Sequence, residues 1–282
     1  MIALIGPTAS GKSDLAIQYA LENDCEILSL DSLSIYKEVD IASAKPSKQE
    51  LNLVKHHGID EIYPDEKFDV MKFIEIYNKI KDKKIIIVGG TSFYLKTMLT
   101  GISQMPKITD EIKKEALKYD WNFIEKIDKS YSQKIKPEDS YRVSKAIEIY
   151  LATSLAPTTY FKLNPPKPII EDCEIYEIAV DRAILRERIV KRTSKMFEMG
   201  LIDEVAYLES KYRDRTLSTL KAIGVKEVLD YFNGVYDKET LKQKIITNTA
   251  RLAKRQQTFN KTQFDNKISL PLEELKTKLL KI

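Results

Sequence analysis

Cysteine and histidine are scarce in this chain of 282 residues, which contains two of each. The cysteines, Cys25 and Cys173, are far apart in the sequence, and the two histidines are adjacent. Neither a zinc-binding spacing nor a disulfide framework can be built from these residues. We expect both cysteines to be small buried side chains.

Long apolar runs are also missing. No run approaches the roughly 20 residues that a membrane-spanning helix needs, and the strand-like N-terminus has no basic region of the kind that opens a secretion signal. Hydrophobic residues make up 43% and charged residues 31% of the chain, as in soluble globular proteins with a core. We therefore expect a cytoplasmic protein that does not contact membranes. We also expect a monomer, although no feature of the sequence fixes the oligomeric state.

The net charge of +4 is small but unevenly distributed. Residues 1–103 hold 12 basic and 15 acidic residues, whereas the remainder holds 34 basic and 27 acidic ones. Residues 242–267 carry seven basic residues and one acid, Asp265. This distribution suits a catalytic core attached to a nucleic-acid-binding region, but it also suits a solvated helix face.

Short apolar runs alternate with helix-like segments over the first 100 residues. Residues 2–5, 26–30 and 85–88 are predicted strands, and residues 13–21 and 68–80 have the apolar spacing of helices. Continuous apolar runs of this kind are typical of strands that are buried on both faces of a parallel sheet. The pattern predicts an α/β fold, with a parallel sheet flanked by helices.

The alternation of strand-like and helix-like segments ends after residue 101. Residues 106–152 contain charged amphipathic segments and no strand-like run, and a proline-rich linker follows at 164–168. A strand is then predicted at residues 174–180. We therefore expect an inserted all-α subdomain, with Trp121 packed inside it. The predicted division is a discontinuous core of residues 1–105 and 172–282, with a helical insertion of residues 106–171.

A phosphate-binding motif follows the first predicted strand and opens the first predicted helix. Its glycines let the backbone turn N–H groups toward an anion, and the helix N-terminus adds a favourable dipole. Lys12 would neutralise phosphate oxygens, and the Ser13 hydroxyl would bind Mg²⁺. The residues of this P-loop are Gly6, Pro7, Thr8, Ala9, Ser10, Gly11, Lys12 and Ser13.

The motif indicates phosphate but not ATP. Nucleoside triphosphatases usually carry an acid at the end of a second apolar strand, whereas the strand at 85–88 ends in Gly89-Gly90-Thr91. The acid that ends an early strand is Asp31. In a parallel sheet Asp31 and Thr91 would both point toward the P-loop. Asp31 could bind a metal or accept a proton, or it could simply cap a turn.

The chain resembles the tRNA dimethylallyltransferases (tRNA isopentenyltransferases), of the bacterial type. The resemblance spans about residues 2–261 in the family's order. Several of its blocks are rare elsewhere, so together they are more specific than the P-loop alone. The blocks are GPTASGKS at 6–13, DSLSIY at 31–36, DI at 40–41, AKP at 44–46, HH at 56–57, VGGT at 88–91, PED at 137–139, MGLIDEV at 199–205, AIG at 222–224 and AKRQ at 253–256.

The resemblance implies an activity: transfer of a dimethylallyl group from dimethylallyl diphosphate to N6 of adenosine 37 in tRNA, with release of diphosphate. Asp31 would be the general base, and Thr91 would meet both substrates. Ser13 would hold Mg²⁺. The chain has no DDxxD cluster, so neutralising the leaving group would fall to the P-loop, with Lys221 assigned to the same task.

The tRNA would bind through its anticodon stem-loop. Base chemistry requires an unstacked nucleotide, and single-stranded loops are bound by aromatic stacking and basic side chains. The family usually has arginine at three of the lysine positions below (113, 145 and 221), where lysine cannot form a bidentate fork. The residues that the resemblance assigns to tRNA contact are Asp31, Ser32, Leu33, Ser34, Thr91, Lys113, Tyr141, Arg142, Lys145, Lys221, Gly224, Lys226, Lys254, Arg255, Gln256 and Phe259.

Other classes of protein stay open on the residues alone. A P-loop kinase would release ADP, prenyl transfer to free adenine nucleotides would not need the basic second half, and a non-catalytic RNA-binding module would bind tRNA without a product. A kinase lid could use the arginines at 182, 186, 188 and 192. Their spacing instead predicts the solvent-exposed face of a helix. The apolar residues predicted to pack inward from the same helix are Ile184, Leu185, Ile189 and Met196.

Overall fold

The computed structural model describes residues 1–280. The chain divides into two compact units. Unit 1 comprises Met1–Thr97 and the chain from Ile170 onward, and unit 2 comprises Met98–Ile169.

Unit 1 is built around a six-stranded sheet, and every pair of neighbouring strands in it is parallel. The order across the sheet is β3-β2-β4-β1-β5-β6, so β1 lies between β4 and β5. The predicted α/β fold is confirmed. The strands are β1 (Ile2–Ile5), β2 (Glu26–Ser29), β3 (His56–His57), β4 (Ile85–Gly89), β5 (Glu174–Ala179) and β6 (Ile268–Pro271).

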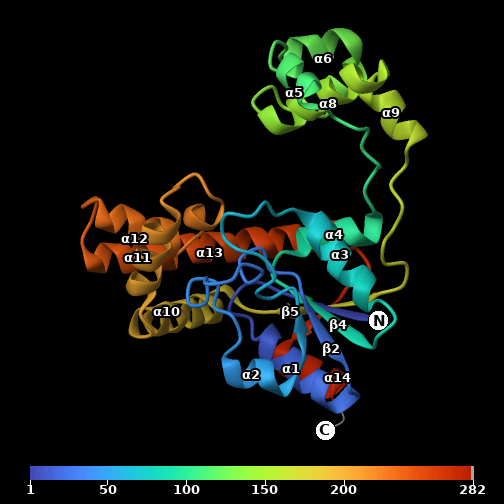
Figure 1. Ribbon diagram of the computed structural model, residues 1–282. Coiled ribbons are helices and arrows are strands. Elements are labelled where there is room, and N and C mark those ends of the chain that lie inside the picture. Colours follow the sequence, from blue (N-terminus) through green and yellow to red (C-terminus); the bar gives the residue numbers. More distant parts are fainter. Residues whose placement is uncertain (281–282) are drawn as a thin grey trace. The chain divides into compact units, whose positions relative to one another are not determined.

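Helices on both faces explain why the central strands are so apolar. Figure 1 shows α1 (Lys12–Asn23) and α14 (Leu272–Leu279) on one face of the sheet and α3 (Val70–Ile80) on the other. All five residues of β4 are buried. A strand covered on both faces has no solvent side, so its sequence is continuously apolar rather than alternating.

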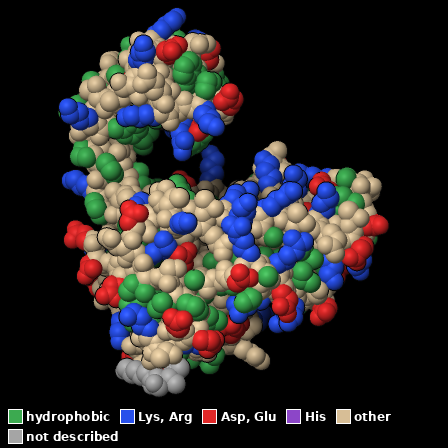
Figure 2. Space-filling model, turned by 180° about the vertical axis from the view of Figure 1, so that it is seen from behind, with side chains coloured by type: hydrophobic (Ala, Val, Ile, Leu, Met, Phe, Trp, Pro, Cys, Tyr) green, Lys and Arg blue, Asp and Glu red, His purple; other side chains and the backbone are tan. Residues whose placement is uncertain are grey.

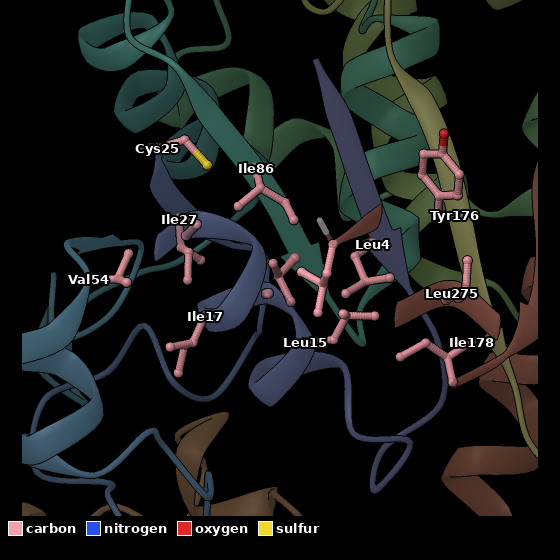
Figure 3. Packing of buried hydrophobic residues seen from close by; sticks show 14 residues of the cluster. Leu4, Leu15, Ile17, Cys25, Ile27, Val54, Ile86, Tyr176, Ile178 and Leu275 are labelled. Atoms are coloured by element: carbon pink, nitrogen blue, oxygen red, sulfur yellow. The ribbon is translucent and has the colours of Figure 1, made fainter. Parts of the chain in front are cut away.

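The core beneath the sheet joins distant parts of the chain. Figure 3 shows Leu15 of α1, Ile86 of β4 and Leu275 of α14 pointing into one cluster, and each of the three is completely buried. Cys25 belongs to this cluster as predicted, whereas Cys173 is only half-buried. Burying such side chains stabilises the fold by about 1.5–3 kcal/mol each, which holds the loops above the sheet in place.

The other helices of unit 1 lie mainly in its second chain segment. Helices α10 and α13 pack through a buried cluster that includes Leu185, Ile189, Ile246 and Ala253. These helices are α2 (Lys48–Leu53), α4 (Ser92–Thr100, which continues into unit 2), α10 (Arg182–Glu198), α11 (Leu201–Tyr212), α12 (Val225–Phe232) and α13 (Lys238–Gln263).

Unit 2 is helical, with one isolated bridge between Ile102 and Lys167. Side-chain oxygens cap several of its helices, which satisfies N–H groups that a helix leaves free; Asp128, for example, accepts a bond from the N–H of Tyr131. A separate core packs against Trp121 as predicted. The helices are α5 (Asp110–Ala116), α6 (Trp121–Ile127), α7 (Lys129–Ser132), α8 (Ser140–Thr153) and α9 (Pro157–Leu163).

Several short elements were not predicted, among them β3, β6 and α14. Strand β3 has two residues, and β6 is mostly exposed, so neither carries a readable alternation. The chain returns to the sheet through β6 and then forms α14, beyond the helices that the sequence predicted up to residue 261. Within residues 1–280, no helix has the length and apolarity required to cross a membrane.

Candidate active site

A cavity of about 500 Å³ opens where the strands of unit 1 end. The loops that follow β1, β2 and β4 meet there, because the carboxyl ends of parallel strands share one edge of a sheet. The cavity is lined by Lys12 and Ser13 from the first loop, Asp31 from the second and Thr91 from the third. The structure therefore brings together residues that the sequence placed up to 79 positions apart.

The P-loop turns sharply between β1 and α1. Gly11 has a φ of 92°, which only glycine adopts without strain. A Cβ on Gly6 would lie 3.0 Å from the hydroxyl of Ser10, which is completely buried. Of the eight motif residues, Thr8, Lys12 and Ser13 line the cavity, and the remainder shape the turn.

Lys12 brings a half-buried positive charge to the cavity. Its Nζ donates a hydrogen bond to the carbonyl of Pro7 at 3.1 Å. Burial lowers the pKa of Lys12 to about 8, the nearby Asp31 carboxylate opposes this shift, and Arg192 adds to it. A buried ammonium with so little compensation favours an anionic ligand.

Helix α10 supplies two cations that the sequence interpretation missed. Arg188 donates to the carbonyl of Ser10 at 3.1 Å, and Arg192 donates to the hydroxyl of Thr8 at 3.3 Å. Arg192 lines the cavity, and burial lowers its pKa. Both arginines were predicted on the wet face of the helix.

That prediction was wrong in two respects. Arg182 and Arg186 are exposed as predicted. Arg188 and Arg192, one helical turn apart, instead donate hydrogen bonds to the P-loop. Ile184, predicted to pack inward, is 49% exposed. The physical reason is that α10 packs on two partners, the P-loop and α13, so its buried surface is wider than one apolar stripe.

Asp31 uses its two carboxylate oxygens differently. Oδ1 accepts the N–H groups of Leu33 at 2.9 Å and Ser34 at 3.0 Å, which makes Asp31 a turn cap. Oδ2 makes no hydrogen bond with any of residues 1–280. The capping interpretation is correct for one oxygen, while the other is free to act on a ligand.

The glycines before Thr91 are explained by close approach. A Cβ on Gly89 would lie 2.7 Å from the carbonyl oxygen of Leu30, because β2 and β4 end side by side. A Cβ on Gly90 would lie 3.0 Å from Nε2 of Gln256. Glycine therefore allows the two strand ends to bring Asp31 and Thr91 to one cavity.

An aromatic wall lines another part of the cavity. Phe68 lies edge-on to Tyr36 and to Tyr94, with ring centroids 5.8 Å and 5.7 Å apart. Burial raises the pKa of Tyr94 to about 12, so its hydroxyl stays protonated. The hydroxyl of Tyr36 lies 3.0 Å from that of Ser218. This wall offers a dry, apolar surface to a flat ligand.

Glu204 of α11 fixes another loop of the cavity. Its carboxylate accepts three backbone N–H groups, from Asp40 at 2.8 Å, Ile41 at 2.7 Å and Ala42 at 2.9 Å. Ala42 lines the cavity. This contact gives a structural reason for the acid within the MGLIDEV block.

The residues assigned to tRNA contact in unit 1 form two groups. Ser32, Leu33 and Ser34 line the cavity beside Asp31. Basic side chains gather on the face of unit 1 seen in Figure 2, over the end formed by α11 to α13. The exposed basic residues of the assigned set in this unit are Lys221, Lys226, Lys254 and Arg255.

Lys221 and two other residues of the assigned set have particular surroundings. Lys221, which the resemblance also assigned to the diphosphate, is exposed and does not line the cavity, although its neighbours Ser218 and Ala222 do. Gly224 is buried at the start of α12, with a φ of 96°. Phe259 is half-buried and lies edge-on to the exposed Phe93, a residue that the sequence did not single out.

Unit 2 holds the remaining assigned residues on α5 and α8. Tyr141 is 71% exposed, and the Nζ of Lys145 lies 5.9 Å from the centre of its ring, one helical turn away. Lys113, Arg142 and Lys145 each pair with an acid on the same helix or at its cap. The surface pairs of Lys113 and Arg142 are weak, so these two cations are available to an anionic partner, whereas Lys145 pairs with the buried carboxylate of Glu148.

The donors for a cation at the cavity are few. Ser13 is exposed and lines the cavity together with Asp31. Among residues 1–280, no cluster of three or more His, Cys, Asp or Glu side chains could hold a metal ion. A hydroxyl and a carboxylate suit Mg²⁺, which keeps several waters and is usually shared with substrate phosphates. Such an ion would bind together with a phosphate ligand.

Known proteins show the same pattern over the whole chain. Residues 34–263 match the family described as IPP transferase. The chain is 71% identical over 280 residues to a tRNA dimethylallyltransferase of Nautilia profundicola, with 99% of each chain covered. It is 44% identical over 291 residues to a tRNA dimethylallyltransferase of Helicobacter pylori, with 100% of this chain and 93% of that one covered.

Solved structures agree with this match. A tRNA delta(2)-isopentenylpyrophosphate transferase from Staphylococcus epidermidis has a TM-score of 0.70 and 30% identity, covering 99% of this chain and 97% of its own. A eukaryotic dimethylallyltransferase acting on tRNA has a TM-score of 0.87 and 25% identity, covering 98% of this chain and 75% of its own. The chain therefore belongs to the IPP transferase family and is an enzyme of the tRNA dimethylallyltransferase type.

Proposed function

We propose that this enzyme transfers the dimethylallyl group of dimethylallyl diphosphate to N6 of adenosine 37 in tRNA. One observation carries the proposal: a single cavity combines an anion-binding loop, a carboxylate oxygen that makes no hydrogen bond within residues 1–280, and an aromatic wall. The family resemblance specifies the acceptor position. A monomeric state and a cytoplasmic location stay predictions.

The P-loop end of the cavity would hold the diphosphate. The N-terminal N–H groups of α1, the ammonium of Lys12 and the guanidinium of Arg192 all present positive charge there. These charges stabilise the leaving group as its negative charge develops. Ser13 would hold Mg²⁺, which when bound adds further neutralisation of the diphosphate.

Asp31 would act as the general base. As N6 of adenosine attacks C1 of the allyl group, the N–C bond forms, the C–O bond breaks, and the diphosphate leaves with the electron pair. The N6 proton passes to Oδ2 of Asp31, the oxygen that makes no internal hydrogen bond. The bonds to Oδ1 hold the carboxylate in orientation. Thr91 lies at the same edge of the sheet, where it can contact both substrates.

The aromatic wall would keep water from the reacting carbon. Positive charge that develops on the allyl group is attracted to the faces of aromatic rings, and Tyr36, Phe68 and Tyr94 supply those rings. Exclusion of water also prevents hydrolysis of the activated donor.

The basic residues of both units would bind the tRNA. The acceptor base must leave its stack to enter the cavity, so the surrounding RNA needs contacts of its own. Lys254 and Arg255 offer phosphate contacts, and Phe259 offers an aromatic face. In unit 2, Tyr141 and Lys145 offer the same combination.

A transfer assay tests this function. Purified protein, Mg²⁺, labelled dimethylallyl diphosphate and unmodified tRNA are incubated, and the nucleosides of the product are separated. We expect label on N6 of one anticodon-loop adenosine. Absence of label, together with ADP release from ATP, would establish the kinase alternative instead. Tight tRNA binding without any product would identify a non-catalytic RNA-binding module.

A further inference from the structure

Gln256 connects two of the loops that form the cavity. Its Oε1 accepts the N–H of Thr8 at 2.8 Å, and its Nε2 donates to the carbonyl of Gly90 at 2.8 Å. Thr8 follows β1 and Gly90 follows β4, and these strands are neighbours in the sheet. One side chain therefore bridges the phosphate loop and the turn that carries Thr91.

Helix α13 is held firmly at this point. The next residue, Gln257, donates from Nε2 to the carbonyl of Val180 at 3.1 Å, just after β5. Ala253 and Asn260, about one turn to either side of Gln256, are 1% and 0% exposed. The buried neighbours Ala253 and Asn260 thus hold this part of α13 in the protein interior, and the bond from Gln257 lies outside the cavity.

Packing at Gly90 provides independent support. A Cβ at this position would lie 3.0 Å from Nε2 of Gln256 and 3.5 Å from Nζ of Lys12. The amide of Gln256 therefore lies directly against the turn before Thr91, and the ammonium of Lys12 lies close to the same turn. A movement of the glutamine would change the surroundings of this turn.

We propose that Gln256 is a positioning residue for the transfer reaction. It sets the separation between the phosphate loop and the Thr91 turn, so that the diphosphate and the incoming adenosine meet in line. Both polar atoms of its amide make a hydrogen bond inside the protein, so we assign this role to it beside the predicted tRNA contact. The inference rests on the proposed function, because it concerns the alignment of that function's two substrates.

Alignment is where such a residue acts most strongly. Displacement reactions gain much of their rate from correct placement of the reacting atoms, and a misplacement of about 1 Å costs about 10²-fold. Gln256→Met keeps similar length and volume but removes both hydrogen bonds. Gln256→Glu keeps the acceptor for Thr8, loses the donor to Gly90, and puts a negative charge beside the diphosphate. Gln257→Met is the matched control, since it removes a hydrogen bond of the same helix outside the cavity.

The test combines steady-state transfer with two binding measurements: tRNA by filter binding, and inorganic diphosphate with Mg²⁺ by calorimetry. For Gln256→Met we expect kcat to fall about 10- to 100-fold. Its diphosphate affinity should fall severalfold, and its tRNA affinity should stay unchanged. Gln256→Glu should lose more diphosphate affinity than Gln256→Met. Gln257→Met should match the wild-type enzyme in all three.

Three results of the kinetic and tRNA-binding measurements would overturn the inference. These are a wild-type kcat in Gln256→Met, a loss of tRNA affinity with unchanged kcat at saturating tRNA, or an equal loss in Gln257→Met. The diphosphate measurement needs no acceptor and so separates the two proposals. If the wild-type protein transfers nothing to tRNA, the proposed function is wrong. If Gln256→Met keeps the wild-type diphosphate affinity, the positioning role of Gln256 is wrong.

Discussion

The cavity and the exposed face of α13 both carry positive charge, but in opposite surroundings. At the cavity, Lys12 and Arg192 are half-buried, and desolvation lowers the pKa of each. On the surface, Lys254 and Arg255 are exposed to solvent. Buried charge interacts strongly over short distances, whereas exposed charge is screened by salt and gives mainly affinity. The first arrangement suits chemistry and the second suits holding a polyanion.

The two regions should therefore respond differently to mutation. Changes in the cavity should reduce the rate and leave tRNA affinity intact. Changes on the exposed helices should reduce tRNA affinity in a salt-dependent way and leave the chemical step intact.

The largest effect is expected at Asp31. Asp31→Asn keeps an oxygen that can accept the N–H groups of Leu33 and Ser34, but it removes the base. We expect kcat to fall about 10²–10⁴-fold, the usual contribution of general acid–base catalysis, with tRNA affinity within about twofold. Single-turnover transfer and filter binding measure the two quantities. A near-normal rate in Asp31→Asn would remove the carboxylate from the mechanism.

Lys12 should give the next largest effect and a distinctive pH dependence. Loss of one charge-stabilising donor costs about 10²–10³ in rate, which is our expectation for Lys12→Met. Because the pKa of Lys12 is lowered to about 8, the wild-type ammonium loses its proton above that pH. Donor affinity should then fall by at most about tenfold per pH unit. Calorimetry at pH 7 and pH 9.5 tests this, and Lys12→Met should lack this component of the pH dependence.

The same lowered pKa has a consequence for stability with the opposite sign. Below pH 8 both the folded and the unfolded protein carry the proton, so the folded state bears the full cost of burying the charge. Between about pH 8 and 10.5 only the unfolded chain keeps it. The unfolding free energy of the ligand-free protein should therefore rise over this range relative to Lys12→Met. Denaturant melts at several pH values check the sign, and a fall would contradict it.

Glu204 should show an intermediate effect on stability. Glu204→Ala leaves the N–H groups of Asp40, Ile41 and Ala42 without their acceptor. Unsatisfied groups of this kind cost about 1–3 kcal/mol, partly recovered where water can reach them. We expect a lower denaturation midpoint and a higher KM for dimethylallyl diphosphate. Glu204→Gln, which keeps an acceptor, should lose less, and equal losses in the two variants would contradict this account.

The smallest effect is expected at Lys254. Its substitution by alanine should weaken tRNA binding severalfold at low salt and reduce the slope of log affinity against log salt by about 0.7–1. The rate at saturating tRNA should not change. An unchanged salt slope would show that this lysine does not contact the RNA backbone.

The sequence predicted the parts of the fold that repeat a strong local pattern. Strand β4 is an uninterrupted β-branched run, and the P-loop motif lies between a clear strand and a clear helix, so these elements were placed within one or two residues. Strand β6 could not be read, because its four residues are stabilised by pairing with β5 and not by their own alternation.

The candidate site residues divide in the same way: those in a clear local pattern were predicted, and those defined by packing were not. Lys12 and Ser13 were predicted because they belong to the P-loop motif, and Asp31 and Thr91 because each follows a predicted strand. Arg188 and Arg192 were missed because helical spacing identifies a polar face of a helix. It does not show whether solvent or a phosphate-binding loop lies against that face. Their position on the helix after β5, next to β1 in the sheet, was the available signal.

The most direct test is a structure of the enzyme with tRNA, Mg²⁺ and a dimethylallyl thiodiphosphate that cannot leave. We predict diphosphate oxygens within hydrogen-bonding distance of Lys12 and the first turn of α1. The N6 atom of the flipped adenosine should lie about 3 Å from Oδ2 of Asp31. A diphosphate bound away from the P-loop, or an adenosine whose N6 is out of reach of Asp31, would contradict the account.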